Sequence, residues 1–248
     1  MLDDFELLDA QVEALFTHDR FGRIQRVNEP GGRRAPRLFL GRTRQGNLWR
    51  FRDDLPEDLV ARLAPILSAE PVASNLPRDP RCLDALRAIL NDDQRIRHEF
   101  AGPAYHFPND LPIRGDSIAI TPENADLLRP GFAYLIPELL QRQPCVAVAR
   151  NGAAVAVCFS SRLSTRVAEA GVETLADFRG RGYASAVTSA WALAVRQRRL
   201  CPLYSTSWQN LASQGVARHL GLVQYGVDLS ITEWRPKEGV RGMPPKVS

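Results

Sequence analysis

The sequence of 248 residues predicts an α+β protein with a mixed, mainly antiparallel sheet and flanking helices. Short apolar segments bounded by turn residues recur along the chain, as expected for strands. An Asn-Gly pair at residues 151–152 joins two of them, which is typical of a tight antiparallel hairpin. Segments with helical periodicity lie between these strands, so helices and strands are expected to pack on one another.

Residues 1–110 are predicted to form a smaller N-terminal α+β domain, and residues 115–236 a second domain. The boundary falls in a segment rich in proline and glycine, residues 103–115. The first domain is expected to hold helices over residues 8–16, 55–67 and 82–90, and strands over residues 37–41, 47–51 and 96–105. No catalytic signature occurs there, so its role stays open.

The second domain is expected to be more regular. Its strands are predicted over residues 116–120, 145–149, 153–160, 167–175, 203–207 and 223–231. Its helices are predicted over residues 182–198 and 210–220, and a helical region over residues 121–140 is expected to be interrupted near Pro130-Gly131. Thr121 is of a type that caps helices, and Gly221 is of a type that closes them.

Composition narrows the possible functions. Four cysteines and four histidines are dispersed without a Cys-x-x-Cys pair, so buried free thiols are expected rather than a metal site. The net charge of +4 comes from arginines spread along the chain, which argues against a nucleic-acid partner. No apolar run has the length of a membrane span, and the acidic start does not resemble a secretory signal. A cytoplasmic protein without a membrane partner is expected.

The segment with a chemical signature is Arg179-Gly180-Arg181-Gly182-Tyr183-Ala184, between a predicted strand and the longest predicted helix. A helix N-terminus offers unpaired N–H groups and partial positive charge, which together favour phosphate. The two glycines allow the backbone to approach the anion closely, and the small residue Ala184 keeps the first turn of the helix clear. The arginines can add charge-assisted hydrogen bonds to the anion. A nucleotide triphosphatase loop and a Gly-x-Ser-x-Gly elbow do not occur in the sequence. Taken alone, the turn is also compatible with a helix entry whose arginines face solvent.

Arg179, Gly182 and Ala184 resemble the pyrophosphate-binding signature Arg/Gln-x-x-Gly-x-Gly/Ala of the GNAT superfamily of N-acetyltransferases. Asn210 and Ser213 are similar to the family's next motif, in the same order and at a matching separation. The resemblance covers roughly residues 116–232. It is closest to the branch that includes glycine N-acyltransferase-like proteins.

The resemblance implies a V-shaped cleft between strands 167–175 and 203–207, with acetyl-CoA as co-substrate and no metal. It places the pyrophosphate at residues 179–184 and the pantetheine arm at Asn210 and Ser213. The arm is also expected to pair with the backbone near Thr174 and Leu175.

The chemistry implied by the resemblance is direct attack of an amine on the thioester, without a covalent enzyme intermediate. Glu169 and Glu173 share one face of strand 167–175, and Glu173 is the preferred general base, although a solvated glutamate is the alternative. Three weaker candidates are Tyr204, Ser205 and His219.

Ala217 occupies the position of the tyrosine that the family uses as general acid. Two functions from different classes therefore stay open. The first is an N-acetyltransferase that acetylates the amine of a small-molecule or amino-acid-like acceptor. The second is a non-catalytic acyl-CoA-binding regulatory module.

Overall fold

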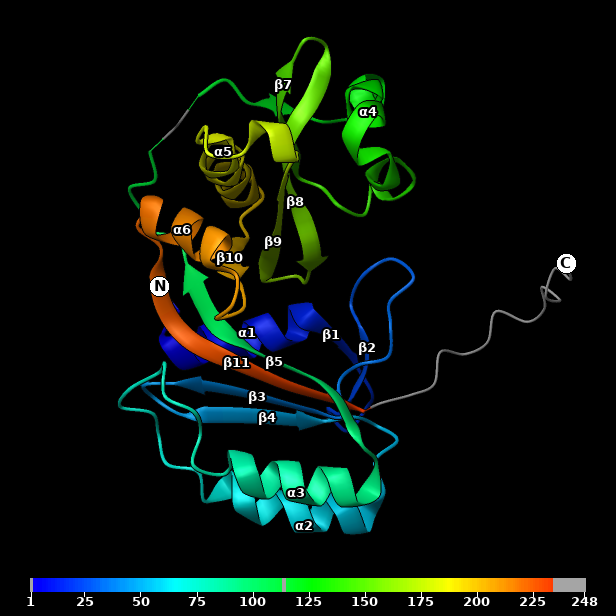
Figure 1. The fold of residues 1–248 in the computed structure, drawn as a ribbon, viewed down its shortest axis with the longest axis vertical. Helices are drawn as coiled ribbons and strands as arrows, with labels where there is room; N and C mark the ends of the chain where they lie inside the picture. The colour runs from blue at the N-terminus through cyan, green and yellow to red at the C-terminus, as the bar shows by residue number, and fades with distance from the viewer. Residues whose placement is uncertain (1, 113–114, 234–248) are drawn as a thin grey trace, which may run out of the picture.

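The computed structural model describes residues 2–112 and 115–233. Its main feature is a nine-stranded sheet with the strand order β4-β3-β11-β5-β10-β9-β8-β7-β6 (Figure 1). The pair β9–β10 is parallel, and the other pairs of this sheet are antiparallel. The predicted fold class is therefore confirmed.

The strands of the large sheet are β3 (Leu38–Thr43), β4 (Asn47–Phe51), β5 (Ile96–His106), β6 (Ile118–Ala119), β7 (Cys145–Arg150), β8 (Ala153–Leu163), β9 (Val167–Thr174), β10 (Cys201–Ser205) and β11 (Val223–Glu233). A small second sheet pairs β1 (Phe16–His18) with β2 (Ile24–Val27). The predicted hairpin joins β7 to β8, and Asn151 and Gly152 adopt the positive φ angles, 50° and 75°, that such a turn requires.

Helices cover both faces of the large sheet. They are α1 (Asp4–Leu15), α2 (Glu57–Ser68), α3 (Leu83–Asp93), α4 (Arg129–Phe132), α5 (Tyr183–Gln197) and α6 (Leu211–His219). Apolar side chains of α2 and α3 pack on β3 and β11, and those of α5 and α6 pack on the strands from β7 to β10. Helix α1 packs on the opposite face, against Phe39, Val167 and Leu203.

The helical region predicted over residues 121–140 is divided into short helices, and the division includes the expected interruption near Pro130-Gly131. This segment forms two 3-10 helices, η1 (Pro122–Leu128) and η2 (Ala133–Glu138), with the short α4 between them. Each of the three begins with or contains a proline, which lacks the N–H group that a regular helix needs. The segment still packs its apolar residues on β7 and β8.

The large sheet runs across the predicted domain boundary. Strand β5 lies between β10 and β11, and β11 also pairs with β3. Strands from residues 1–110 therefore complete the sheet of residues 115–236. The division of the chain into two domains stays a prediction, and the two parts are joined by continuous strand pairing.

Two strands separate near the middle of the large sheet. Strand β10 pairs with β9 from Cys201 to Leu203, opposite Val167 to Glu169. Beyond Glu169, β9 continues to Thr174 alongside β8, while β10 ends at Ser205 alongside β5. The two strands therefore diverge. Beyond the point of divergence, the edge of β9 that faces β10 and the edge of β10 that faces β9 are no longer paired with each other.

No helix among residues 2–112 and 115–233 is long and apolar enough to cross a membrane.

Candidate active site

The diverging ends of β9 and β10 form a cleft with a volume of about 880 Å³. Most of the predicted site residues line it: Glu173, Thr174, Arg179, Gly180, Gly182, Tyr183, Ala184, Asn210 and Ser213. Leu175 and Arg181 do not contribute to its lining. Strand β9, the turn after it, β10 and α6 thus bring together residues that the sequence separates.

The glycine-rich turn is shaped for a close approach by an anion. Gly180 and Gly182 have φ angles of 75° and 79°, in the left-handed region that favours glycine. Gly182 is the N-cap of α5, and a Cβ built there or at Gly180 would find no atom within 4 Å. The start of a 15-residue helix therefore faces open space, as the sequence predicts.

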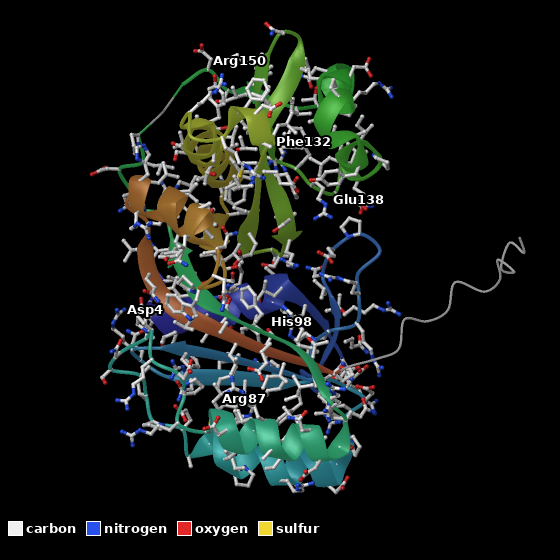
Figure 2. The ribbon with its side chains drawn as sticks, in the orientation of Figure 1. Asp4, Arg87, His98, Phe132, Glu138 and Arg150 are labelled. Carbon is white, nitrogen blue, oxygen red and sulfur yellow. The ribbon has the colours of Figure 1, made fainter. Side chains whose placement is uncertain are left out.

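Arginines surround this turn. Arg179 donates from Nε to the carbonyl oxygen of Thr174 at 3.3 Å, and Arg181 donates to the carbonyl oxygen of Asp177 at 3.1 Å. Both side chains are exposed. Arg150, labelled in Figure 2, adds a third positive charge, because its guanidinium carbon lies 4.9 Å from the ring centroid of Tyr183. The sequence offered no signal for Arg150, which arrives from the β7–β8 hairpin.

The backbone groups of Leu175, which are predicted to pair with the pantetheine arm, already have hydrogen-bond partners in the protein. The N–H group of Leu175 donates to Val155 at 3.0 Å, and its carbonyl accepts from Phe178 at 2.9 Å. Both groups are therefore used inside the protein. Because backbone groups alternate along a strand, Thr174 and Val172 direct theirs to the open edge of β9. Leu175 as a pairing residue stays a prediction, and Val172, which lines the cleft, also has its backbone groups at the open edge.

Asn210 and Ser213 form the start of α6 on the opposite wall. The Asn210 side chain caps the helix by accepting from the N–H group of Ser213 at 3.0 Å. The Ser213 hydroxyl lies 2.6 Å from the hydroxyl of Tyr204, whose pKa burial raises to about 12. Tyr204 therefore keeps its proton at neutral pH and joins β10 to α6.

Glu173 and Glu169 lie on the same face of β9, as predicted, in different surroundings. Glu173 is exposed at the cleft and accepts a short hydrogen bond from the hydroxyl of Tyr134. Glu169 is 2% exposed, and burial raises its pKa. The ring of Phe159 packs over Gly171, which lies between the two glutamates along the strand.

A second cavity, of about 600 Å³, adjoins the cleft. It shares Ser205, Thr206 and Asn210 with the cleft, and β5 and β8 add His98, Phe100 and Arg162. Ser205 donates to the buried Glu169 at 3.2 Å. The two cavities therefore meet at the end of β10, in front of a carboxyl group.

The other candidate residues have distinct places. Trp191, on α5, is fully buried in the core, and Ala217 is buried on α6. His219 lines the cleft from the end of α6. The cysteines are free thiols, three of them buried, and no group of ligands suited to a metal occurs among the described residues.

The cleft combines a glycine-rich helix entry with the split between two parallel strands. Residues 140–226 match the family model of the GNAT acetyltransferases and form a GNAT acetyltransferase domain. The glycine N-acyltransferase-like branch stays a prediction. No curated protein matches the chain.

Solved structures of the same family resemble the chain. A GCN5-related N-acetyltransferase-like protein from Streptococcus suis is 20% identical, with a TM-score of 0.49, over 81% of this chain and 85% of that one. A GNAT-family acetyltransferase from Colwellia psychrerythraea is 14% identical, with a TM-score of 0.47, over 75% of this chain and 76% of that one. The aminoglycoside N-acetyltransferase AAC(6')-Iy, in complex with CoA, is 19% identical, with a TM-score of 0.36, over 53% of this chain and 100% of that one.

Proposed function

We propose that the protein transfers an acetyl group from acetyl-CoA to the amine of a small-molecule or amino-acid-like acceptor. The observation that carries this proposal is the position of Gly182. It caps the N-terminus of α5 at the point where β9 and β10 diverge, with open space above it.

We place the pyrophosphate of the co-substrate at the glycine-rich turn, residues 179–184. The first N–H groups of α5 and the partial positive charge of the helix start attract phosphate oxygens. Arg179, Arg181 and Arg150 add positive charge around the same opening. The residues present therefore suit a polyanionic nucleotide group at this end of the cleft.

We place the pantetheine arm along the open edge of β9. The backbone groups of Val172 and the N–H group of Thr174 are available to an extended amide-containing chain in the way that a neighbouring strand would use them, while the Thr174 carbonyl accepts from Arg179. Asn210 and Ser213 bound the arm on the other side. The thioester is then directed to the junction of the two cavities at Ser205.

The acceptor is proposed to enter through the second cavity. Its volume, about 600 Å³, lies in the range of small-molecule sites. An acceptor arriving as an ammonium ion must lose one proton before its nitrogen can attack. Glu173, exposed on the same strand face as Glu169, is proposed as the base that removes this proton.

A binding module without catalysis is the second candidate. Ala217 favours it, because a buried methyl group stands where the resemblance places a tyrosine acid. Tyr204 brings another protonated phenol to the cleft wall, which supports the enzyme.

The experiment combines binding and turnover. Calorimetry with CoA and acetyl-CoA measures affinity, and release of free thiol in the presence of a panel of amines measures transfer. We expect binding of both and acetyl-CoA-dependent thiol release with at least one amine class. Tight CoA binding without turnover on every amine would support the binding module, and failure to bind CoA would exclude both functions.

A further inference from the structure

A group of polar side chains lies behind the junction of the two cavities. The Gln11 amide, from α1, donates to the Asp228 carboxyl on β11 at 2.9 Å. The same amide makes a hydrogen bond that favours the charged form of Glu169 on β9. Ser205 connects Glu169 to both cavities by its hydrogen bond of 3.2 Å. Helix α1 and three strands thus contribute to one cluster, called here the α1 cluster: Gln11, Glu169, Ser205 and Asp228.

The α1 cluster is withdrawn from solvent. Gln11 is 0% exposed, and Glu169 and Asp228 are each 2% exposed. Four buried oxygen atoms in this region have no hydrogen-bond partner among the described residues: Gln11 Oε1, Glu169 Oε1, Asp228 Oδ1 and Tyr225 Oη. Buried acceptors without donors indicate an additional proton or water in the group.

The surrounding charges do not balance two ionised carboxyl groups. Arg162, directly opposite Glu169 on β8, is the cation whose charge lowers the Glu169 pKa, and Arg162 also pairs with Glu29 at 3.2 Å. Cys201 and Tyr225 face the same group, and burial raises the pKa of both, so they stay neutral at neutral pH. Glu29 is also paired with Arg33 at 3.6 Å, so the excess of negative charge lies on the two buried carboxyl groups, and a bound proton relieves it.

The proton belongs on Asp228. Burial and the charge of Glu169 raise the pKa of Asp228 to about 8. Burial raises the pKa of Glu169 as well, but Arg162, Gln11 and Ser205 oppose that effect, whereas Gln11 alone opposes it at Asp228. The shared proton is therefore assigned to Asp228, which has fewer groups that favour its charged form than Glu169 has.

We infer that Glu169 is a second proton acceptor of the transfer reaction, reached through Ser205, and that Gln11 and Asp228 are positioning residues that keep it ionised in a buried site. This inference rests on the proposed function. An ammonium acceptor loses two protons in becoming an amide, and Glu173 takes the first of them. As the nitrogen–carbon bond forms and the carbon–sulfur bond breaks, the nitrogen gives its second proton to Ser205, and Ser205 passes its own proton to Glu169. The departing sulfur takes up one proton from its surroundings, so acetylated amine, free thiol and one net proton result.

Glu169→Gln tests the acceptor role with little change in shape. We expect kcat to fall by about 100-fold, the range typical of a lost proton-transfer group, with the dissociation constant for CoA within about twofold of the parent value. Glu233→Gln is the matched control, because Glu233 is a buried carboxylate elsewhere on β11, bound to Arg52. An unchanged kcat in Glu169→Gln would overturn the inference while leaving the proposed function intact.

Two further variants test the positioning residues through the pH profile of kcat. The parent protein is expected to show an inflection near pH 8 from Asp228. Asp228→Asn should abolish this inflection. Gln11→Met should move it to higher pH, because the Gln11 hydrogen bond lowers the Asp228 pKa. A merely structural role would change kcat without moving the inflection, and that result would refute the positioning role.

An infrared measurement separates this inference from the proposed function, because it needs no turnover. The carbonyl stretch of a protonated carboxyl group should be present in the parent protein at pH 7 and absent in Asp228→Asn. Its absence from the parent protein would overturn the shared-proton arrangement, whether or not an acceptor amine has been found.

Discussion

The hydroxyl groups of Tyr204 and Ser213 lie 2.6 Å apart, and this contact joins the end of β10 to the first turn of α6. The tyrosine hydroxyl is also placed to donate to the Ser213 carbonyl at 3.3 Å. Since β10 and α6 form one wall of the cleft, the pair determines where that wall stands relative to β9.

Tyr204→Phe should loosen this wall. Loss of one hydrogen bond lowers stability by about 1 kcal/mol, so the midpoint of thermal unfolding should fall by about 2–4 °C. We also expect weaker CoA binding by calorimetry, because Ser213 loses the partner that orients it. Tyr105→Phe is the control, since that ring lies 6.5 Å from Tyr204 on the neighbouring strand. Equal losses in both variants would show that the Tyr204–Ser213 contact has no specific role.

Gly182→Val should abolish CoA binding. A β-branched residue in the left-handed region is strained by roughly 1–2 kcal/mol, and its side chain would fill the space above the helix start. Gly22→Val carries the same type of strain in the turn between β1 and β2, which contributes no residue to the cleft, because Gly22 also has a positive φ angle, 76°, and open space around it. Calorimetry should therefore show loss of CoA binding in the first variant and retention in the second, with similar losses of stability in both.

Glu173→Gln should slow turnover by about 100-fold while CoA affinity stays unchanged, because only the proton acceptor is removed. The amount of free thiol released at fixed reaction times measures the rate. Tyr134→Phe removes the hydrogen-bond partner and leaves the carboxylate in place, so its rate should stay within about tenfold of the parent. A Glu173→Gln protein with the parental rate would remove Glu173 as a base.

Asn210 should reveal two separable roles. Asn210→Ala loses the cap of α6, which costs about 1 kcal/mol in unfolding free energy. Asn210→Asp retains a capping oxygen and adds a negative charge beside the binding site for a polyanion. Denaturant unfolding should place only the alanine variant below the parent, whereas calorimetry should show weakened CoA binding in both. An aspartate variant that binds CoA like the parent would contradict a contact at this position.

Stability should fall as the pH rises from about 4 to about 8. The pKa of Asp228 is raised from 3.8 to about 8 in the folded protein, so the folded state keeps a proton that the unfolded chain has lost in this interval. The folded state is therefore increasingly disfavoured until pH 8. Urea unfolding at pH 5 and pH 8.5 measures the effect, and Asp228→Asn should show a smaller difference between the two. Parallel losses in both proteins would assign the pH dependence to other groups.

Features with a local signal in the sequence were predictable. The turn at residues 151–152 and the helix entry at Gly182 depend on glycine at positive φ angles, which neighbouring residues reveal. The helix cap at Asn210 is also a local feature, because asparagine is a residue type that caps helices. The alternation of backbone groups along a strand is also a local rule, and it separates Thr174 from Leu175, whose N–H group bonds to Val155.

Features that depend on distant pairing were not predictable from one sequence. Gln11 and Asp228 are 217 positions apart, and nothing in either segment indicates that they meet behind Glu169. The position of β5 between β10 and β11 is of the same kind. Strand register across such separations is determined by the whole sheet, and apolar periodicity reports only that a segment is a strand.

The place of β11 has a consequence for synthesis on the ribosome. Strands β3 and β5 emerge early, and each must wait for β11, the last strand of the described residues, to cover its edge. During that interval the nascent chain presents unpaired strand edges, which are templates for association with other chains. Ribosome-bound intermediates should therefore depend on chaperones until β11 has left the exit tunnel.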